Sequence, residues 1–354
     1  MRGRPLRNAG STVMARLAAP TTERPTRLAV LADPHVSTRA DGSPKQFERT
    51  EGFLKAAITD INGRDVDAVV SVGDLTKDGA PWDFARVDDC LADLDSPFFA
   101  VPGNHDVPKT FDDHRSASRG RFVDQYTPGR LPYQVSVGGV DLLALDSAWT
   151  PAGDLRDSHD GRVTSGQLAW LEDRAETADC PVVFTHHTLP PTARQAASSG
   201  AATGVDMSAV PVLRNGESVM ETLGSAGVPL ALTGHIHLPG VATRDGAGSG
   251  TDSVTEITAP SICTFPQAYL LVDIDSRGTT VRYVSTASAG ESIAAYSARL
   301  DGTAIDRAQA AVGATRTAGL PLVEEWQPAP PAPTPTTPFS RPQRTDDYPS
   351  EQSP

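Results

Sequence analysis

Residues 28–35 read LAVLADPH, an apolar run that ends directly in Asp33, Pro34 and His35. The same arrangement occurs four more times along the chain. Short apolar runs that are rich in β-branched residues and bounded by Gly, Pro or Asp are typical of buried strands. The later runs DAVVSV, FFAVP, PVVFT and PLALT end at Gly73-Asp74, Gly103-Asn104-His105-Asp106, His186-His187 and Gly234-His235-Ile236-His237. The sequence therefore predicts five strands that each deliver Asp, Asn or His at their ends.

Helical patterns separate some of these strands. Apolar residues recur at helical spacing in 46–62, and Thr164 and Gln167 have capping-box spacing at the start of a second segment. Strands that alternate with helices predict βαβ units and an α/β fold. Nearer the C-terminus, the runs 269–274 and 280–285 flank a turn and predict a hairpin. The late part of the sheet should therefore be antiparallel or mixed.

The polar strand ends predict a metal site. In open α/β sheets, ligands bind at the carboxyl ends of strands, so these side chains would meet at one edge if the strands share one sheet. Carboxylate and imidazole donors suit ions such as Mn, Fe, Co, Ni and Zn, and no cysteine lies in any cluster. Seven nitrogen and oxygen donors suit two divalent ions with a shared carboxylate. The predicted metal ligands are Asp33, His35, Asp74, Asn104, His186, His235 and His237.

The order of these motifs, D-x-H, GD, GNHD, HH and GHxH, resembles the calcineurin-like metallophosphoesterase superfamily over residues 27–290. The stretch 73–79, GDLTKDG, is similar to the GDLTDxG version of the cyclic-nucleotide phosphodiesterase-like branch. Lys77 stands where that branch usually has Asp. The resemblance implies a four-layer α/β/β/α sandwich with mixed sheets and a dimetal site at the strand ends.

The resemblance also implies how the ligands divide between the ions. It assigns one metal to Asp33, His35 and His237, the second to Asn104, His186 and His235, and the bridge to Asp74. A hydroxide that bridges the two ions would attack phosphorus in line. In the family pattern the first histidine after the strand is the ligand, which selects His186 over His187.

Two catalytic residues outside the ligand set follow from the GNHD motif. His105 matches the non-ligand histidine of the family and would stabilise or protonate the leaving oxygen. Asp106 would stand behind His105 as a carboxylate that orients its ring. The arginines 115, 119 and 121 follow this motif, and they suit either a phosphate clamp or an exposed basic loop.

Composition restricts the classes of function. The net charge of −13 argues against broad nucleic-acid binding. The three cysteines are widely spaced and form no CxxC pair, which favours a reducing compartment, and we expect a cytoplasmic protein. No apolar run approaches the roughly 20 residues that span a membrane, and the N-terminus lacks the apolar stretch of a secretory signal. Met1 and Met14 both remain candidate start sites.

The chain divides into four expected regions. Residues 1–25 should be a flexible arm, and 26–290 should form the metallophosphoesterase domain. Residues 291–324 form a C-terminal extension of undefined structure. Residues 325–354 are rich in Pro, Thr, Ser and Asp and should be a disordered tail.

The sequence therefore predicts a dinuclear metallophosphoesterase with two ions of the Mn, Fe or Zn class. The expected substrate is a phosphodiester or phosphomonoester of a small molecule, with cyclic nucleotides as one candidate. Two alternatives remain open: a nuclease that acts on nucleic-acid ends, and a non-catalytic metal-bound scaffold. The oligomeric state is not predicted.

Overall fold

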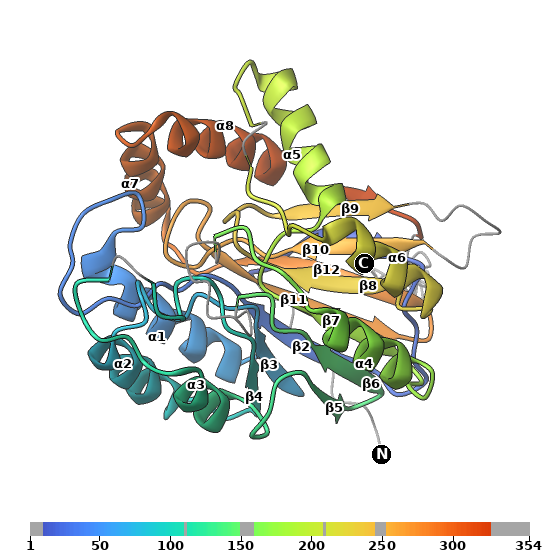
Figure 1. Cartoon of the computed structure of the whole chain (residues 1–354). Helices are drawn as coiled ribbons and strands as arrows, with labels where there is room; N and C mark the ends of the chain where they lie inside the picture. Colours follow the sequence, from blue (N-terminus) through green and yellow to red (C-terminus); the bar gives the residue numbers. More distant parts are fainter. Residues whose placement is uncertain (1–9, 110–111, 149–158, 208–209, 245–252, 327–354) are drawn as a thin grey trace, which may run out of the picture.

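Two mixed β-sheets lie face to face and form the middle layers of the molecule (Figure 1). The computed structural model describes residues 10–109, 112–148, 159–207, 210–244 and 253–326. Helices cover the outer faces of both sheets. Within the described residues, no helix has the length and apolar character needed to cross a membrane.

The first sheet has seven strands. Their order is β13 (Val323–Glu324), β1 (Thr12–Leu17), β12 (Gly278–Ser285), β11 (Ala268–Asp275), β2 (Thr26–Leu31), β3 (Ala68–Ser71) and β4 (Phe98–Ala100). The strands β2, β3 and β4 are parallel, whereas β11 is antiparallel to both β2 and β12. Every residue of β2 and β3 is buried, as expected for parallel strands that are covered on both faces.

The second sheet has six strands. Their order is β5 (Tyr133–Val137), β6 (Val140–Ala144), β7 (Pro181–Phe184), β8 (Leu230–Thr233), β10 (Val254–Thr258) and β9 (Gly240–Arg244). The four middle strands are parallel, and the two edge strands run antiparallel to their neighbours. The carboxyl ends of the parallel strands therefore share one edge of this sheet.

The helices lie outside the two sheets or at one end of them. One outer layer contains the short 3-10 helix η1 (Phe47–Arg49), α1 (Thr50–Asn62), α2 (Pro81–Leu91) and α3 (Arg119–Tyr126). The other outer layer contains α4 (Ser165–Ala175) and α6 (Gly216–Ser225). The helices α5 (Pro190–Thr203), α7 (Ala289–Leu300) and α8 (Ala304–Ala318) lie at one end, and α7 and α8 appear in red in Figure 1.

Three apolar clusters hold the layers together. Side chains of both sheets, among them Leu28 and Leu230, fill the space between the sheets. A second cluster joins α1, α2 and α3 to the outer face of the first sheet, with Phe84 fully buried. A third joins α4 and α6 to the second sheet, with Leu171 and Leu223 fully buried. This is the predicted four-layer α/β/β/α sandwich.

The strand ends reach the site from two sheets rather than from one. The strands that precede Asp33, Asp74 and Asn104 belong to the first sheet. The strands that precede His186 and His235 belong to the second. An apolar run indicates a buried strand but does not say which strand lies beside it, so sequence periodicity left this point open.

The N-terminal region differs from the expected flexible arm over 1–25. Residues 12–17 form β1, which pairs antiparallel with β12, and Met14, Ala15 and Leu17 are buried between the sheets. The partner strand lies more than 260 residues further along the chain, so no local pattern reports the pairing. Residues 1–9 and 327–354 lie outside the described residues, and the prediction of a disordered tail stays a prediction.

Candidate metal centre

The predicted ligands meet at the edge where the carboxyl ends of the parallel strands of both sheets lie together. Asp33, His35, Asp74, Asn104, His186 and His237 are buried, and His235 is half-buried. These residues come from five segments separated by up to about 200 residues, so the fold alone brings them together. Two groups of donor atoms result, with Asp74 between them.

The first group contains Asp33, His35, Asp74 and His237, whose ligand atoms lie within 4.8 Å of one another. The Nε2 atoms of His35 and His237 are 3.1 Å apart. Asp33 Oδ1 lies 3.4 Å from His237 Nε2, and Asp74 Oδ2 lies 3.5 Å from His35 Nε2. Two carboxylates and two imidazoles therefore point to one common volume.

The second group contains Asn104, His186 and His235. His186 Nε2 lies 3.1 Å from Asn104 Oδ1 and 3.1 Å from His235 Nδ1. Asp74 Oδ2 is 3.4 Å from the same His186 nitrogen. The same carboxylate oxygen thus lies near a nitrogen of each group, which is the position of a bridging ligand between two metal ions.

The chemistry of these donors fits divalent cations. His186 Nδ1 donates to the carbonyl oxygen of Val72 at 2.8 Å, so Nε2, which faces the oxygens of Asn104 and Asp74, is the nitrogen that is placed to bind a metal ion. Acceptors that face one another repel unless a proton or a metal ion lies between them. His235 Nε2 is also buried and has no hydrogen-bond partner among the described residues. Ligand positions on a metal ion account for the facing donors, to which His235 contributes its Nδ1.

The protonation states agree with this arrangement. Burial lowers the pKa of His35, His235 and His237, so these imidazoles are neutral, the form that binds metals. Burial also acts on His186, but the carboxylates of Asp74 and Asp33 outweigh it and raise the pKa of His186 to about 9. The negative charge that attracts a proton to His186 equally attracts a metal ion.

The backbone at the ligands is strained. Eight non-glycine residues have positive φ among the described residues, and five of them belong to the ligand set. These five are Asp33, His35, Asp74, His235 and His237, with φ between 44° and 72°. Such conformations cost on the order of 1–3 kcal/mol each and persist where the surrounding structure enforces them, typically at functional sites.

Two glycines allow the loops to approach the carboxylate of Asp74. A Cβ atom on Gly103 would lie 2.1 Å from Asp74 Oδ1, and a Cβ atom on Gly73 would lie 2.7 Å from the backbone nitrogen of Gly103. Gly73 also has a φ of 103°. No larger residue fits at either position without a shift of the loops that carry Asp74 and Asn104.

His105 lies beside the donor groups without belonging to them. Its backbone N–H donates to Asp74 Oδ1 at 2.8 Å, and its ring lies edge-on to His35 with centroids 4.6 Å apart. His105 Nδ1 donates to the carbonyl oxygen of Lys77. This contact fixes the ring and leaves Nε2 for a substrate. Burial and the charge of Lys45 lower the pKa of His105 to about 3.

The expected contact between Asp106 and the His105 ring is absent, because the Lys77 carbonyl takes that place. The carboxylate of Asp106 instead accepts hydrogen bonds from the backbone N–H groups of Leu75, Thr76 and Gly103, at 2.9 to 3.1 Å. Asp106 therefore ties the loop after β3 to the loop after β4. Its effect on His105 is indirect, through the position of these loops.

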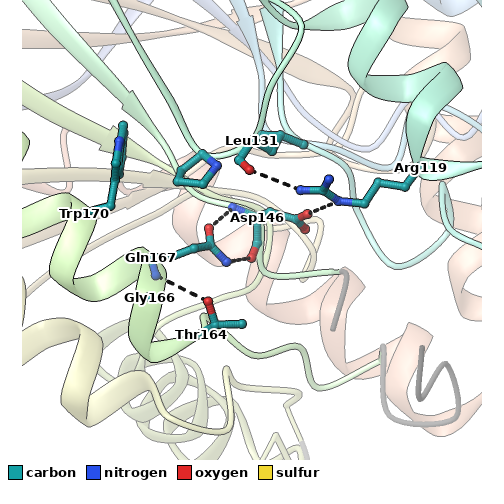
Figure 2. Close-up of a pocket in the computed structure, with 8 residues that line it drawn as sticks. Arg119, Leu131, Asp146, Thr164, Gly166, Gln167 and Trp170 are labelled. Carbon is teal, nitrogen blue, oxygen red and sulfur yellow. Dashed lines mark hydrogen bonds and ion pairs between the residues drawn. The ribbon is translucent and has the colours of Figure 1, made fainter. Parts of the chain in front are cut away.

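His187 is held from the side of the second sheet. Its Nδ1 lies 2.8 Å from Ser147 Oγ. Asp146, which precedes Ser147 in the chain, is itself held in place, as Figure 2 shows. Its backbone forms two hydrogen bonds with the Gln167 side chain, and its carboxylate pairs with Arg119 at 3.2 Å. Arg119 and Arg121 pair with Asp146 and Asp88, so neither is placed as a phosphate clamp.

A cavity of about 570 Å³ opens above the donor groups. Asp74, Asn104, His105, His235 and His237 line its floor. Its walls include residues that sequence reasoning did not select, namely Lys45, Phe47, His159, Arg299, Ile305 and Gln309. None of these belongs to a motif, and only the tertiary structure brings them to the site.

Comparisons with known proteins identify the family of the chain. The calcineurin-like phosphoesterase profile matches residues 26–239. A probable cyclic nucleotide phosphodiesterase from Synechococcus sp. is 28% identical over 213 residues, which cover 60% of this chain and 71% of that protein. Another, from Fibrobacter succinogenes, is 27% identical over 166 residues, which cover 46% of this chain and 56% of that protein.

A solved structure shows the same fold. A dimetal phosphatase from Danio rerio aligns with a TM-score of 0.57 at 15% sequence identity, over 75% of this chain and 98% of that one. Together, the family profile and the two groups of metal-binding side chains define a phosphoester hydrolase that works with two divalent metal ions. With more than half of its length matched, the chain belongs to the calcineurin-like phosphoesterase family.

Proposed function

We propose that this protein hydrolyses a phosphodiester of a small molecule, with cyclic nucleotides as the first candidates and phosphomonoesters as the second. The observation that carries the proposal is the position of Asp74 Oδ2, 3.5 Å from His35 Nε2 and 3.4 Å from His186 Nε2. A carboxylate shared by two groups of donors supports a pair of ions at the base of a substrate-sized cavity.

The proposed ligand assignment follows the two groups of donor atoms. We assign one ion to Asp33, His35 and His237, the other to Asn104, His186 and His235, and the bridge to Asp74. The all-nitrogen-and-oxygen donor set favours Mn, Fe or Zn. A ligand atom of His187 also lies within 4.8 Å of ligand atoms of His186 and His235, but we keep His187 outside the set because the family pattern uses the first histidine after the strand.

The chemical step needs charge neutralisation and a proton at the leaving oxygen. When bound, two divalent ions neutralise phosphoryl oxygens and activate water as a nucleophile. His105 supplies the proton from Nε2, because its Nδ1 is already used by the Lys77 carbonyl. A neutral His105 has no hydrogen on Nε2, so it acts as the acid only when the negative charge of the substrate raises its pKa.

The substrate class rests on the cavity and the relatives. A volume of about 570 Å³ is in the range of small-molecule sites. Phe47, Ile236 and Ile305 offer apolar contacts for a base or another flat group. The relatives from Synechococcus and Fibrobacter are named as probable cyclic nucleotide phosphodiesterases. The net charge of −13 disfavours a nuclease, and the presence of His105 disfavours a scaffold without activity.

We also propose a cytoplasmic location. Cys90, Cys180 and Cys263 are buried and unpaired, as expected for a protein of a reducing compartment.

A hydrolysis assay tests the proposal. With added Mn²⁺, the wild type should cleave bis(p-nitrophenyl) phosphate and 3′,5′-cyclic AMP. Asp74→Asn should lower kcat/KM on the order of a hundredfold or more, since it removes the shared charge. The matched control is Asp83→Asn, a buried aspartate that binds Thr38 outside the cavity and should keep activity. A folded wild type without activity toward any ester under any divalent metal would contradict the proposal.

A further inference from the structure

One wall of the cavity comes from the helix pair α7–α8, which lies beyond residues 26–239 that match the family profile. Arg299 at the end of α7 and Ile305, Asp306 and Gln309 of α8 line the cavity. The α8 residues Ala308 and Val312 pack in one buried cluster with Ile236, the residue between two ligands. The helix α8 is therefore packed against the loop that carries His235 and His237, and α7 lies next to α8 (Figure 1).

Arg299 carries a buried positive charge with an unused donor. Its side chain is 1% exposed. Its Nε donates to the Phe265 carbonyl at 2.6 Å, and Nη1 donates to Gln309 Oε1. Nη2 is buried and has no hydrogen-bond partner within the described part of the chain. A buried donor without an acceptor is costly, and more so when it is charged, so this atom indicates a missing acceptor.

The carboxylate of Asp306 does not supply the missing acceptor for Arg299 Nη2. Asp306 Oδ1 lies 3.9 Å from Arg299 Nη1, a distance beyond a hydrogen bond. The other oxygen of Asp306 accepts from the backbone N–H and the hydroxyl of Thr303 at the start of α8. Asp306 thus caps its own helix and only partly balances the guanidinium.

Lys45 supplies a second cation on the same cavity. It is half-buried, and it has no carboxylate within ion-pair distance among the residues that the structure describes. Its Nζ lies 3.4 Å from His35 Nδ1. A metal ion on His35 Nε2 leaves the ring proton on Nδ1, and an ammonium group has only donors. Lys45 then needs a different acceptor, and the cavity is where that acceptor has room.

We propose that Lys45 and Arg299 form a subsite for a second phosphate group of the substrate, a proposal that rests on the proposed function. The carboxylates of Asp306 and Asp74 line the same cavity, but Asp306 caps α8 and Asp74 would bind the metal ions, so both cations remain available to a phosphate. A phosphate offers enough acceptor oxygens for both Lys45 Nζ and Arg299 Nη2. Lys45 Nζ lies 3.4 Å from His35 Nδ1, the His35 ring lies edge-on to His105, and Lys45 and His105 line the same cavity, so the subsite lies on the side of the leaving group. The preferred substrate is therefore a phosphoester whose leaving group carries a further phosphate.

A matched pair of ligands tests this subsite. Adenosine 3′,5′-bisphosphate and adenosine 3′-monophosphate differ only in the second phosphate. Their inhibition constants against hydrolysis of bis(p-nitrophenyl) phosphate, and their calorimetric dissociation constants with the Mn²⁺-loaded protein, should differ. The wild type should bind the bisphosphate about tenfold more tightly or better. Lys45→Gln and Arg299→Gln should each reduce this ratio to nearly one, and Lys45→Arg should retain it.

The control variant is Arg316→Gln. Arg316 is a buried arginine of the same helix pair that donates to the Pro239 carbonyl at 2.9 Å and does not line the cavity. It should keep the wild-type ratio. If Arg299→Gln fails to fold, the ratio of affinities in Lys45→Gln tests the subsite alone. This variant should fold, because Lys45 lies in the loop before η1 and outside the apolar core.

The outcomes separate the two proposals. Hydrolysis of bis(p-nitrophenyl) phosphate without any preference for the bisphosphate overturns the subsite and leaves the proposed function intact. A preference that persists in Lys45→Gln also overturns the subsite. Tighter binding of the bisphosphate that is lost in Lys45→Gln supports the subsite. If the wild type shows this result but cleaves no ester, the subsite stands and the proposed function fails.

Discussion

The Oδ2 atom of Asp74 lies 3.4 Å from Nε2 of His186, although the first residue follows a strand of the seven-stranded sheet and the second follows a strand of the six-stranded sheet. The site therefore depends on how the two sheets face each other. A change in the packing between the sheets would separate the two donor groups even if every ligand were kept.

The variant His105→Ala should separate catalysis from metal binding. No donor group loses a ligand, so the metal content should match that of the wild type. We expect kcat to fall on the order of a hundredfold or more for alkyl diesters, and much less for p-nitrophenyl esters, whose leaving group needs no proton. Steady-state kinetics with both ester types measure this difference.

The control is His114→Ala, which removes a histidine that lies edge-on to Trp82 outside the cavity. It should leave the ratio of rates for the two esters unchanged. Equal losses on both ester types in His105→Ala would remove His105 from the proton-transfer step.

The variant Gly103→Ala should damage the site through the backbone. Its Cβ atom would lie 2.5 Å from the backbone nitrogen of Asp74, an atom that cannot move without its loop. We expect a loss of about 1–3 kcal/mol in the free energy of unfolding, with reduced metal content. Denaturant titration and metal analysis measure the two effects.

Gly120→Ala is the matched change in α3, where the nearest atom to a new Cβ is 3.6 Å away. It should be neutral or stabilise the helix by up to about 1 kcal/mol. If Gly103→Ala and Gly120→Ala had the same free energy of unfolding and the same metal content, the close approach of Gly103 to Asp74 would not be needed for the site.

Glu256 should make the protein less stable as pH rises. Burial raises the pKa of Glu256 to about 7, above the ordinary value of 4.5. The folded protein then keeps a proton that the unfolded chain releases. The stabilisation is complete below pH 4.5 and is lost as pH rises through 7, and it amounts to about 3 kcal/mol.

Denaturant titrations between pH 4.5 and 8 measure this dependence. Glu256→Gln cannot ionise and should show a flatter dependence than the wild type. Its overall stability should be lower, because both carboxyl oxygens of Glu256 accept hydrogen bonds from the backbone of Leu189 and Thr192, and an amide nitrogen cannot accept one of them. Identical slopes for the two proteins would contradict the raised pKa.

The sequence was informative where a residue and its structural context are neighbours in the chain. Asp33 and His35 follow their own strand directly, so a local pattern predicted their position at a strand end. The same holds for His235 and His237. The fold class followed from the same alternation of apolar runs, together with the resemblance of the ordered motifs.

The sequence was less informative where the decisive contact is distant. Asp106 is next to His105 in the chain, yet its carboxylate binds the backbone of the loop at 75–76. Arg299 lies in the helix α7, which carries no sequence motif. Its importance comes from its Nη2 atom, a buried donor without a hydrogen-bond partner among the described residues, in a side chain that lines the cavity. The strand 12–17 was missed for the same reason, because its partner is β12.

Metal analysis of the purified protein tests the central claim, a carboxylate shared by two ions. After saturation with Mn²⁺ and removal of the excess, the wild type should hold two ions per chain, and Asp74→Asn should hold one at most while it remains folded. Wild-type protein that binds fewer than two ions at saturation, or an Asp74→Asn variant that still binds two, would contradict the account.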